Sequence, residues 1–263
     1  MAFRSKDKEI VYQGIKFLVP TRDITIVPGL MNGYYELAEI NIYKALLPSS
    51  KTILDVGANI GLYSLVGATY GKKTTKIYAF EPVPENIQYF KRSLQLNDIR
   101  PTAITLVESA VGAKEGKLKL NLSPITIGTH TAGTMVGPGV KTISVPMTTI
   151  DAFVQKHKLS VDILKIDIEG YEGFALRGAQ ATIKRQTPTI LMEYLPELLA
   201  HTDFPAEEMR KLLFSHYTHC FVINDLTSQI TLIDIKTTDL ASFKGNLVLT
   251  NNPKHIKSIE QFV

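Results

Sequence analysis

Short apolar runs alternate along the chain with stretches in which apolar residues recur at helical spacing. The runs have the length of buried strands, and the stretches between them place an apolar residue every three to four positions, as on one face of a helix. Strands that alternate with helices are typical of a parallel sheet covered by helices. The expected strands are Ile53–Leu54, Lys76–Phe80, Ile104–Val107, Val161–Gly170 and Thr189–Tyr194, and helices are expected from Leu62, Pro84 and Thr149.

The pattern changes toward the C-terminal end of the chain. Cys220–Ile223 and Ile230–Ile233 are apolar runs that flank a polar turn, which predicts a hairpin, and Gly245–Thr250 predicts a last strand. We therefore expect an α/β fold with a mostly parallel sheet and an antiparallel element at its C-terminal edge.

A smaller unit is expected before this alternation begins. Residues 11–19 alternate loosely between apolar and polar positions, Pro20 interrupts them, and residues 24–27 resume the β pattern. A helix is expected over residues 34–47. We predict an N-terminal extension of β segment and helix over residues 1–48 and a main domain over residues 49–263.

Two acids of the expected helix, Glu36 and Glu39, fall off its apolar stripe. One interpretation is that both face water. The other is that the helix lies beside a ligand site and that a carboxylate looks inward.

The segment Thr52–Ser64 carries the main candidate binding motif. It reads as a strand ending in an acid, a glycine turn and the start of a helix. Open α/β sheets bind ligands at such turns, because glycines let a ligand approach the backbone and a helix start has unpaired N–H donors. A dinucleotide fingerprint is excluded, since Asn59 and Leu62 stand where it needs glycines. The candidate contacts are Asp55, Gly57, Ala58, Asn59 and Gly61, and an ordinary tight turn is the alternative.

Acidic and polar residues also follow the next two strands. Glu81 comes about 20 residues after the glycine turn, the range in which an acid takes ribose hydroxyls. A carboxylate suits this role because it can accept two hydrogen bonds from a vicinal diol; a surface acid before Pro82 is the alternative. After the third strand come Glu108, Ser109 and Ala110. We expect this strand end beside an adenine ring, with Glu108 or Ser109 receiving the exocyclic amine.

The fourth expected strand carries three ionisable residues on one face. Lys165, Asp167 and Glu169 point the same way because side chains alternate along a strand. A strand inside a parallel sheet is normally apolar on both faces, so a lysine there needs a carboxylate partner. Glu193 similarly ends the fifth strand. We take these residues as candidates for chemistry, with charges at a frayed strand end as the alternative.

A long loop at residues 123–140 separates two β segments, residues 117–122 and 142–146. It is rich in Gly, Thr and Pro and lacks helical or strand periodicity. Loops of this kind often form lids or contact substrates. His130 is its only residue that titrates near neutrality, either as a participant in chemistry or as a solvated bystander.

Composition narrows the class of protein. The net charge of +4 comes from scattered lysines, without the concentrated basic patch of a nucleic-acid binder. No apolar run reaches the roughly 20 residues that span a bilayer, and the polar N-terminus lacks the apolar core of a signal peptide. The single cysteine, Cys220, cannot form an internal disulfide. These features predict a cytoplasmic protein without membrane partners.

The motifs together resemble the FkbM-type S-adenosylmethionine (SAM) methyltransferases. The resemblance covers roughly residues 30–250 and implies a Rossmann-like sheet of seven strands, SAM as the cofactor, and O-methylation of a hydroxyl on a sugar-like or polyketide-like molecule. Residues 113–150 match only loosely, so we expect substrate choice to be set there. The resemblance rests on GYYELAE (33–39), ILDVGANIGLYS (53–64), YAFEPVPENI (78–87), SAVG (109–112), ILKIDIEGYE (163–172), ILMEY (190–194) and GNLVL (245–249).

Methyl transfer to an alkyl hydroxyl needs a proton acceptor, because the hydroxyl pKa is far above neutrality. The candidates are Asp167, Glu169, Glu193 and His130, and we favour the carboxylates because they end strands at the expected crevice. Lys165 would orient one carboxylate or offset their repulsion. Acids this close could instead hold Mg²⁺, which prefers oxygen ligands, although we do not favour a metal.

Two other functions are compatible with the motifs. One is a SAM-binding partner protein without catalysis. The other is a nucleic-acid ribose methyltransferase; methylation of base amines is disfavoured, because DIEG stands where those enzymes carry (Asn/Asp)-Pro-Pro-(Tyr/Phe). A homo-oligomer is compatible with either function.

Overall fold

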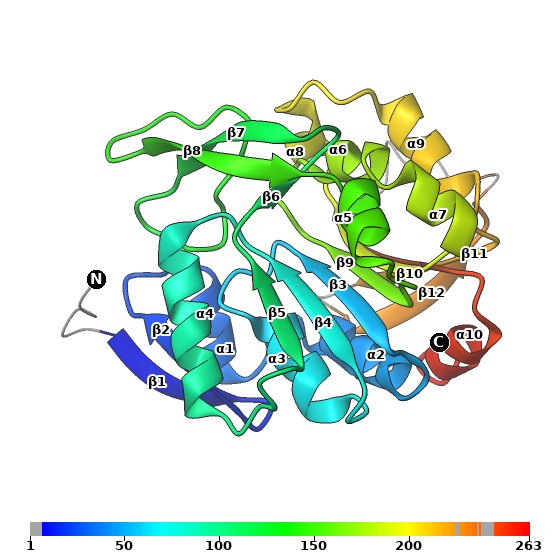
Figure 1. Cartoon of the computed structure of the whole chain (residues 1–263), viewed down its shortest axis with the longest axis horizontal. Helices are drawn as coiled ribbons and strands as arrows, with labels where there is room; N and C mark the ends of the chain where they lie inside the picture. The colour runs from blue at the N-terminus through cyan, green and yellow to red at the C-terminus, as the bar shows by residue number, and fades with distance from the viewer. Residues whose placement is uncertain (1–6, 225–226, 236, 238–244) are drawn as a thin grey trace.

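An eight-stranded sheet forms the centre of the molecule (Figure 1), in the order β12-β11-β13-β10-β9-β3-β4-β5. The computed structural model describes residues 7–224, 227–235, 237 and 245–263. The parallel strands are β3 (Thr52–Val56), β4 (Lys76–Phe80), β5 (Ile104–Val107), β9 (Ile163–Ile166) and β10 (Thr189–Tyr194).

The C-terminal edge of this sheet is antiparallel, as predicted. Strand β13 (Gly245–Thr250) pairs antiparallel with both β10 and β11 (His219–Asn224), and β12 (Gln229–Ile233) completes a hairpin with β11. The Rossmann-like α/β class is therefore confirmed. The hairpin adds an eighth strand to the seven that the family resemblance implies.

Helices cover both faces of the sheet, because alternate strand residues are apolar toward each side. Ile53 and Ile163 pack on one face, and Leu54 and Leu164 on the other. The first face is covered by α1 (Ile26–Asn32), α2 (Leu37–Leu46), α3 (Leu62–Tyr70), α4 (Pro84–Leu96) and α10 (Pro253–Ile259). The second is covered by α5 (Ile150–His157), α6 (Glu172–Arg177), α7 (Gln180–Gln186) and α9 (Ala206–Phe214). The short elements η1 (Leu47–Ser49) and α8 (Pro196–Ala200) complete the list.

The N-terminal segment begins with a hairpin of β1 (Asp7–Tyr12) and β2 (Ile15–Pro20), which contacts α1 and α4. The expectation of a strand at residues 24–27 is wrong, because α1 begins there. Asp23 accepts hydrogen bonds from the backbone N–H groups of Ile26 and Val27 at 2.7 and 2.9 Å. This satisfies the orphan donors of the first helical turn and overrides the β preference of the Ile-Thr-Ile-Val run.

The helix expected over residues 34–47 is shorter, because α2 starts at Leu37. Gly33 ends α1 with a positive φ of 81°, and Glu36, just before α2, has a φ of 47°. The chain therefore turns between two helices at the GYYE segment.

A separate three-stranded sheet lies beyond the carboxyl ends of β3, β4 and β5 (Figure 1). It consists of β6 (Ala110–Val111), β7 (Gly116–Leu122) and β8 (Lys141–Thr148). The pairing of β7 with β8 is antiparallel, which confirms the expected return of residues 142–146 beside residues 117–122. The long loop between them is thereby brought over the end of the main sheet.

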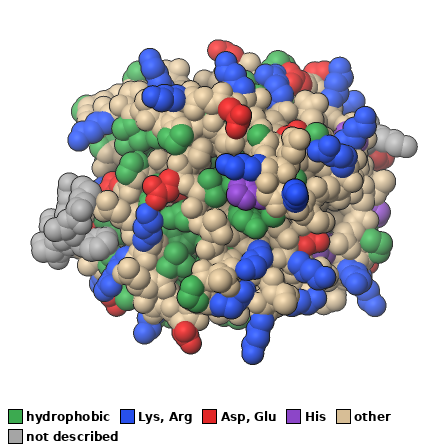
Figure 2. Space-filling model, viewed as in Figure 1, with side chains coloured by type: hydrophobic (Ala, Val, Ile, Leu, Met, Phe, Trp, Pro, Cys, Tyr) green, Lys and Arg blue, Asp and Glu red, His purple; other side chains and the backbone are tan. Residues whose placement is uncertain are grey.

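The surface agrees with the scattered charge of the sequence. Figure 2 shows Lys and Arg side chains spread over the face in view and interspersed with acidic and apolar ones. Within the ranges described, no helix combines the length and apolar character needed to cross a bilayer.

Candidate active site

The glycine turn after β3 is tied to the end of β4. The backbone N–H groups of Gly57 and Ala58 donate to the Phe80 carbonyl at 3.0 and 2.9 Å. Gly57 and Gly61 have φ values of +85° and +93°, a region that glycine adopts without strain. The turn is thus held rigidly at the carboxyl ends of neighbouring parallel strands, beside the point where the chain order reverses between β3 and β9.

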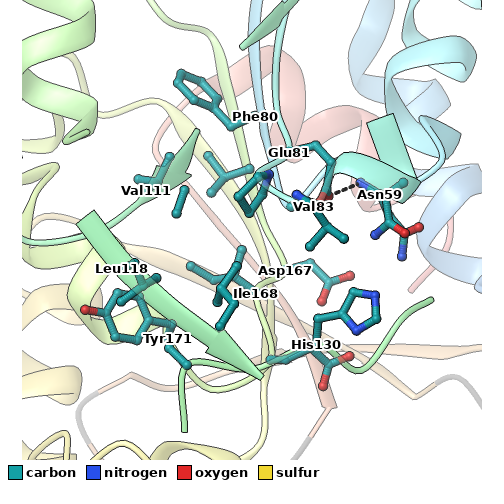
Figure 3. A pocket seen from close by; sticks show the side chains of 18 of the residues that line it. Asn59, Phe80, Glu81, Val83, Val111, Leu118, His130, Asp167, Ile168 and Tyr171 are labelled. Atoms are coloured by element: carbon teal, nitrogen blue, oxygen red, sulfur yellow. Dashed lines mark hydrogen bonds between the residues drawn. The ribbon is translucent and has the colours of Figure 1, made fainter. Parts of the chain in front are cut away.

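The Glu81 carboxylate is fixed beside this turn. It is 4% exposed. One oxygen accepts the backbone N–H of Asn59 at 2.8 Å, and the other accepts that of Val83 at 2.8 Å (Figure 3). Burial raises the Glu81 pKa to about 7, against the lowering effect of these hydrogen bonds. Each oxygen keeps a second lone pair for a ligand hydroxyl.

A cavity of about 590 Å³, part of it open to solvent, lies in front of Glu81 (Figure 3). We call it the strand-end cavity. Of the candidate residues, the ones that line it are Gly57, Asn59, Glu81, Pro82, Ser109, Ala110, His130, Asp167 and Glu169.

A second cavity, of about 710 Å³ and also open to solvent, adjoins the first. We call it the tyrosine cavity because Tyr35 and Tyr63 line it, together with Glu36 and Ala58. The two cavities share part of their walls and therefore lie next to one another. The shared residues are Gly57, Asn59, Gly128, Asp167 and Glu169.

Other candidate residues lie outside both cavities. Asp55 accepts a hydrogen bond from the Ser64 hydroxyl at 2.6 Å, and burial raises its pKa to about 6. Glu108 pairs with Lys91 at 2.6 Å on the exposed surface. Of the two residues left open for the adenine amine, the structure therefore brings Ser109 to the cavity. Gly61, Lys165 and Glu193 also do not contribute to either lining.

Lys165 lies at the centre of a buried ion-pair chain. Its Nζ is 3.4 Å from Glu39 and 3.2 Å from Asp167, which confirms that a lysine inside the sheet needs carboxylate partners. Lys165 and Glu39 are each 1% exposed, so the inward-facing interpretation of the α2 acids is correct for Glu39. Burial alone would lower the Lys165 pKa, but Asp167 and Glu39 outweigh it and raise the pKa well above its usual value.

Two glutamates at the ends of β9 and β10, Glu169 and Glu193, have raised pKa values. Burial, reinforced by the charge of Asp167, raises the Glu169 pKa to about 9 and the Glu193 pKa to about 8. Strand β9 ends at Ile166, earlier than the pattern predicted, and Glu169 has a positive φ of 54°. In the described parts of the chain, no three His, Cys, Asp or Glu side chains converge as a metal site.

Several lining residues were missed by sequence reasoning. Tyr35 comes from the turn before α2, and Tyr63 from α3, where its hydroxyl donates to Glu36 at 2.7 Å. Glu36 was not missed: it is one of the two acids considered for an inward position, and it lines the tyrosine cavity. Backbone strain is a signal that only the structure supplies: three non-glycine residues with positive φ, Glu36, Asn59 and Glu169, all line the tyrosine cavity. Strain of this kind is often found at functional sites.

Comparison with known proteins agrees with this geometry. The family model described as the methyltransferase FkbM domain matches residues 55–220, more than half of the chain. The chain belongs to the methyltransferase FkbM domain family. The match begins at the acid before the glycine turn and ends at β11, so it contains both the turn and the KIDIEGYE segment. This places the chain among the SAM-dependent methyltransferases.

Two fungal methyltransferases are among the proteins to which the chain is similar. Methyltransferase sdnD of Sordaria araneosa is 28% identical, with 59% of this chain and 77% of that protein covered. Methyltransferase 1 of Beauveria bassiana (strain ARSEF 2860) is 25% identical, with 51% of this chain and 60% of that protein covered. Among solved structures, methyltransferase FkbM from Methylobacillus flagellatus KT has a TM-score of 0.48 and 18% identity, with 77% of this chain and 44% of that chain covered.

Proposed function

We propose that this FkbM-family chain transfers the methyl group of SAM to a hydroxyl of a sugar-like or polyketide-like small molecule. The observation that carries the proposal is the meeting of the two cavities at Asp167 and Glu169, beside the fixed Glu81 carboxylate. We assign the donor's nucleoside to the strand-end cavity, and the methionyl group and the acceptor to the adjoining tyrosine cavity.

The residues present fit SAM. Glu81 would accept the ribose hydroxyls, and Ser109 and Ala110 would border the adenine. The backbone of the Gly57-Ala58 turn would contact the methionyl part of SAM. The turn is held in place for this contact by its hydrogen bonds to the Phe80 carbonyl. Two buried amide oxygens at the cavity, Oδ1 of Asn59 and of Asn86, have no hydrogen-bond partner among the described residues, as expected where a ligand completes the site.

When bound, SAM supplies a methyl group attached to a positively charged sulfur. The chain's own task is to hold the acceptor hydroxyl in line with that methyl and to take its proton. We assign the proton to Asp167, which lines both cavities and carries its charge opposite Lys165. The raised pKa of Glu169 favours its protonated form at neutral pH, and in that form it would donate a hydrogen bond that orients the acceptor hydroxyl.

Calorimetry with S-adenosylhomocysteine (SAH) tests the donor site. Glu81→Gln should weaken SAH binding by about tenfold or more, because it removes a charged acceptor of two ligand hydroxyls. The exposed Glu108→Gln is the matched control and should bind as the wild type does. Absence of SAH binding by the wild type would contradict the proposal.

A turnover assay tests the transfer itself. Labelled SAM with a panel of hydroxyl-bearing small molecules should give labelled product with the wild type, and Asp167→Asn should lose most of this activity. Binding of SAH without transfer to any acceptor would favour a non-catalytic SAM-binding partner, and transfer to RNA alone would favour a ribose methyltransferase.

A further inference from the structure

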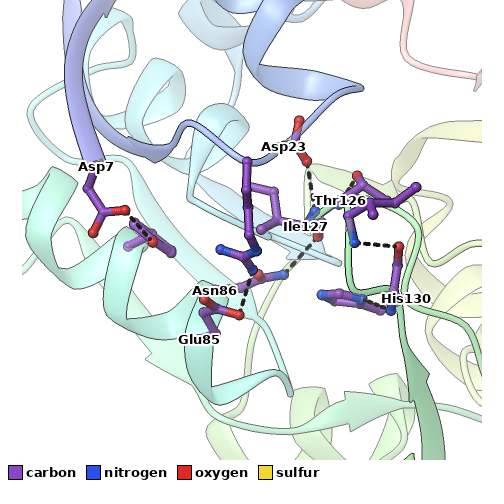
Figure 4. Close-up of polar contacts among 12 residues, drawn as sticks. Asp7, Asp23, Glu85, Asn86, Thr126, Ile127 and His130 are labelled. Atoms are coloured by element: carbon purple, nitrogen blue, oxygen red, sulfur yellow. Dashed lines mark hydrogen bonds and ion pairs between the residues drawn. The ribbon is translucent and has the colours of Figure 1, made fainter. Parts of the chain in front are cut away.

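A short segment of the long loop, residues 126–131, crosses the site where the two cavities meet. We call it the strap. Its first anchor is the Ile127 peptide (Figure 4). The Ile127 N–H donates to Asp23 at 2.7 Å, and its carbonyl accepts from Nδ2 of Asn59 and Asn86 at 3.1 and 3.2 Å. Three separate parts of the chain therefore hold the backbone of this one residue.

The second anchor of the strap is Thr131. Its N–H and carbonyl pair with the Asn121 backbone at 3.1 and 2.8 Å, and its hydroxyl donates to the Glu169 carbonyl at 2.9 Å. Between the anchors, Gly128 lines both cavities and His130 lines the strand-end cavity. His130 is thus presented to the cavity by a segment fixed on both sides.

The hydrogen bonds of His130 determine which ring nitrogen carries the proton. The backbone N–H of Ser123 donates to Nδ1 at 3.1 Å, so Nδ1 has no proton. A neutral ring must then carry its proton on Nε2, as assigned from this hydrogen-bond network. Nε2 is buried at the cavity and has no partner among the described residues. In this arrangement the ring offers a donor to the cavity and has no free lone pair there.

Burial favours the neutral form of the His130 ring more than the neighbouring charges do. Burial lowers the His130 pKa to about 4; Arg22 lowers it further, and Asp23 opposes the shift. Arg22 is itself paired with Glu85 of α4 at 2.8 Å (Figure 4). Asp167 and Glu169 belong to the wall formed at the end of β9. A ring that is neutral across the physiological range and protonated at Nε2 cannot accept a proton from a substrate through Nε2.

We propose that His130 is a ligand-binding residue whose Nε2–H donates a hydrogen bond to the donor's nucleoside in the strand-end cavity, and that it is not the proton acceptor of methyl transfer. The inference rests on the proposed function for the identity of the nucleoside. The unpartnered atoms Oδ1 of Asn59 and Asn86 and Nε2 of His130 border the same cavity, so a ligand that offers donors to the amides and an acceptor to the imidazole satisfies all three.

Nitrogen NMR of the histidine side chains tests the proposal in the wild-type protein. The His130 ring, assigned by its disappearance in His130→Gln, should show a protonated Nε2 and an unprotonated Nδ1 between pH 5.5 and 8. Addition of SAH should shift the Nε2 resonance and leave that of His219, on β11 at the far edge of the sheet, unchanged. A protonated Nδ1, titration near pH 6.5, or an Nε2 resonance insensitive to SAH would overturn it.

Variants give a second readout. His130→Phe should weaken SAH binding by about tenfold, since a donor is lost, whereas His130→Gln, which keeps an N–H donor, should bind within about threefold of the wild type. The pH dependence of kcat should keep its shape in His130→Gln. Loss of an ionisation from that profile would identify His130 as the base instead. Failure of the wild type to bind SAH would contradict the proposed function. The tautomer of the His130 ring in the ligand-free protein would be measured independently of that result.

Discussion

A β-carbon added to Gly57 would lie 1.8 Å from the backbone oxygen of Asp167. The same two strand ends are joined by the Asp167 N–H, which donates to the Val56 carbonyl at 3.0 Å. The glycine turn after β3 and the acid after β9 are therefore one packed unit. Any change that moves the turn also moves the carboxylate that faces both cavities.

Gly57→Ala should consequently lose stability and SAH binding together. The new β-carbon must displace Asp167 and also adopt a positive φ of 85°. Gly33→Ala is the matched control, because Gly33 has a φ of +81° and a β-carbon added there would meet no atom within 4 Å. In the control, the free energy of unfolding should fall only by the energy that a non-glycine residue needs to adopt the left-handed backbone conformation, about 1–2 kcal/mol. Denaturant unfolding and calorimetry measure both effects, and equal losses in the two variants would refute the packing argument.

Lys165→Met should destabilise the fold by about 3–5 kcal/mol, because the variant leaves Glu39 with an uncompensated buried charge and also removes the partner of the half-buried Asp167. Lys91→Met removes the exposed pair with Glu108 and should cost no more than about 1 kcal/mol. Urea unfolding gives both values. The double variant Lys165→Met with Glu39→Gln should recover part of the loss, and no recovery would show that Glu39 is not a partner of the lysine.

The fold and the glycine turn were predictable because their signals are local. Apolar periodicity located the strands of the main sheet, and the acid that ends β4 follows the turn at a spacing set by one strand-helix-strand unit. The buried lysine was also predictable, since Lys165 sits at a position that a parallel strand normally fills with an apolar residue. In each case a short stretch of chain contains the whole argument.

The rest of the site depends on contacts between distant residues. The helix at Ile26 forms because of the Asp23 carboxylate, which also holds Ile127 about 100 residues away. No spacing rule connects those two segments. Glu108 and Ser109 were equally good candidates by position, and the choice between them depends on Lys91 of α4, which draws Glu108 to the surface.

The stability of the protein should fall as the pH rises from about 5 to 9. Glu169 and Glu193 have folded-state pKa values of about 9 and 8, above the usual carboxyl value of about 4.5. The folded state thus binds more protons than the unfolded state. The contribution of Glu169 and Glu193 to the free energy of unfolding is therefore fully present below about pH 4.5, and it is lost as the pH rises through about 8 to 9. Glu81 and Glu172, both with pKa values raised to about 7, act in the same direction.

Unfolding free energies measured at intervals across this pH range check the slope. The double variant Glu169→Gln with Glu193→Gln should show a shallower decline than the wild type, because two of the titrating groups are removed. Glu108→Gln should leave the slope unchanged. An identical slope in the double variant would mean that the two carboxyls titrate normally in the folded protein.

Both cavities are open to solvent, but the strap crosses the place where they meet, so we predict that it moves when a ligand that fills both enters or leaves. Its Thr126 hydroxyl is in hydrogen-bond contact with the Thr25 hydroxyl of the N-terminal segment, and Gly128 lines both cavities. Because these two hydroxyls are in contact, we choose positions 25 and 126 for an engineered disulfide, in the variant Thr25→Cys with Thr126→Cys. The natural cysteine, Cys220, is buried and so does not compete for pairing.

Oxidation of this double variant should slow both association and dissociation of SAH, each by about tenfold or more, while the equilibrium affinity changes far less. The reason is that a covalent tie raises the barrier to strap opening equally for both directions and leaves the closed site unaltered, so the rates change by a common factor. Stopped-flow binding measures the rates, and reduction with dithiothreitol should restore them. The single variant Thr25→Cys controls for loss of the hydroxyl contact. Unchanged rates in the oxidised protein would show that ligands enter and leave without movement of the strap. The hydrogen bonds that hold Ile127 would then contribute only to the stability of the site.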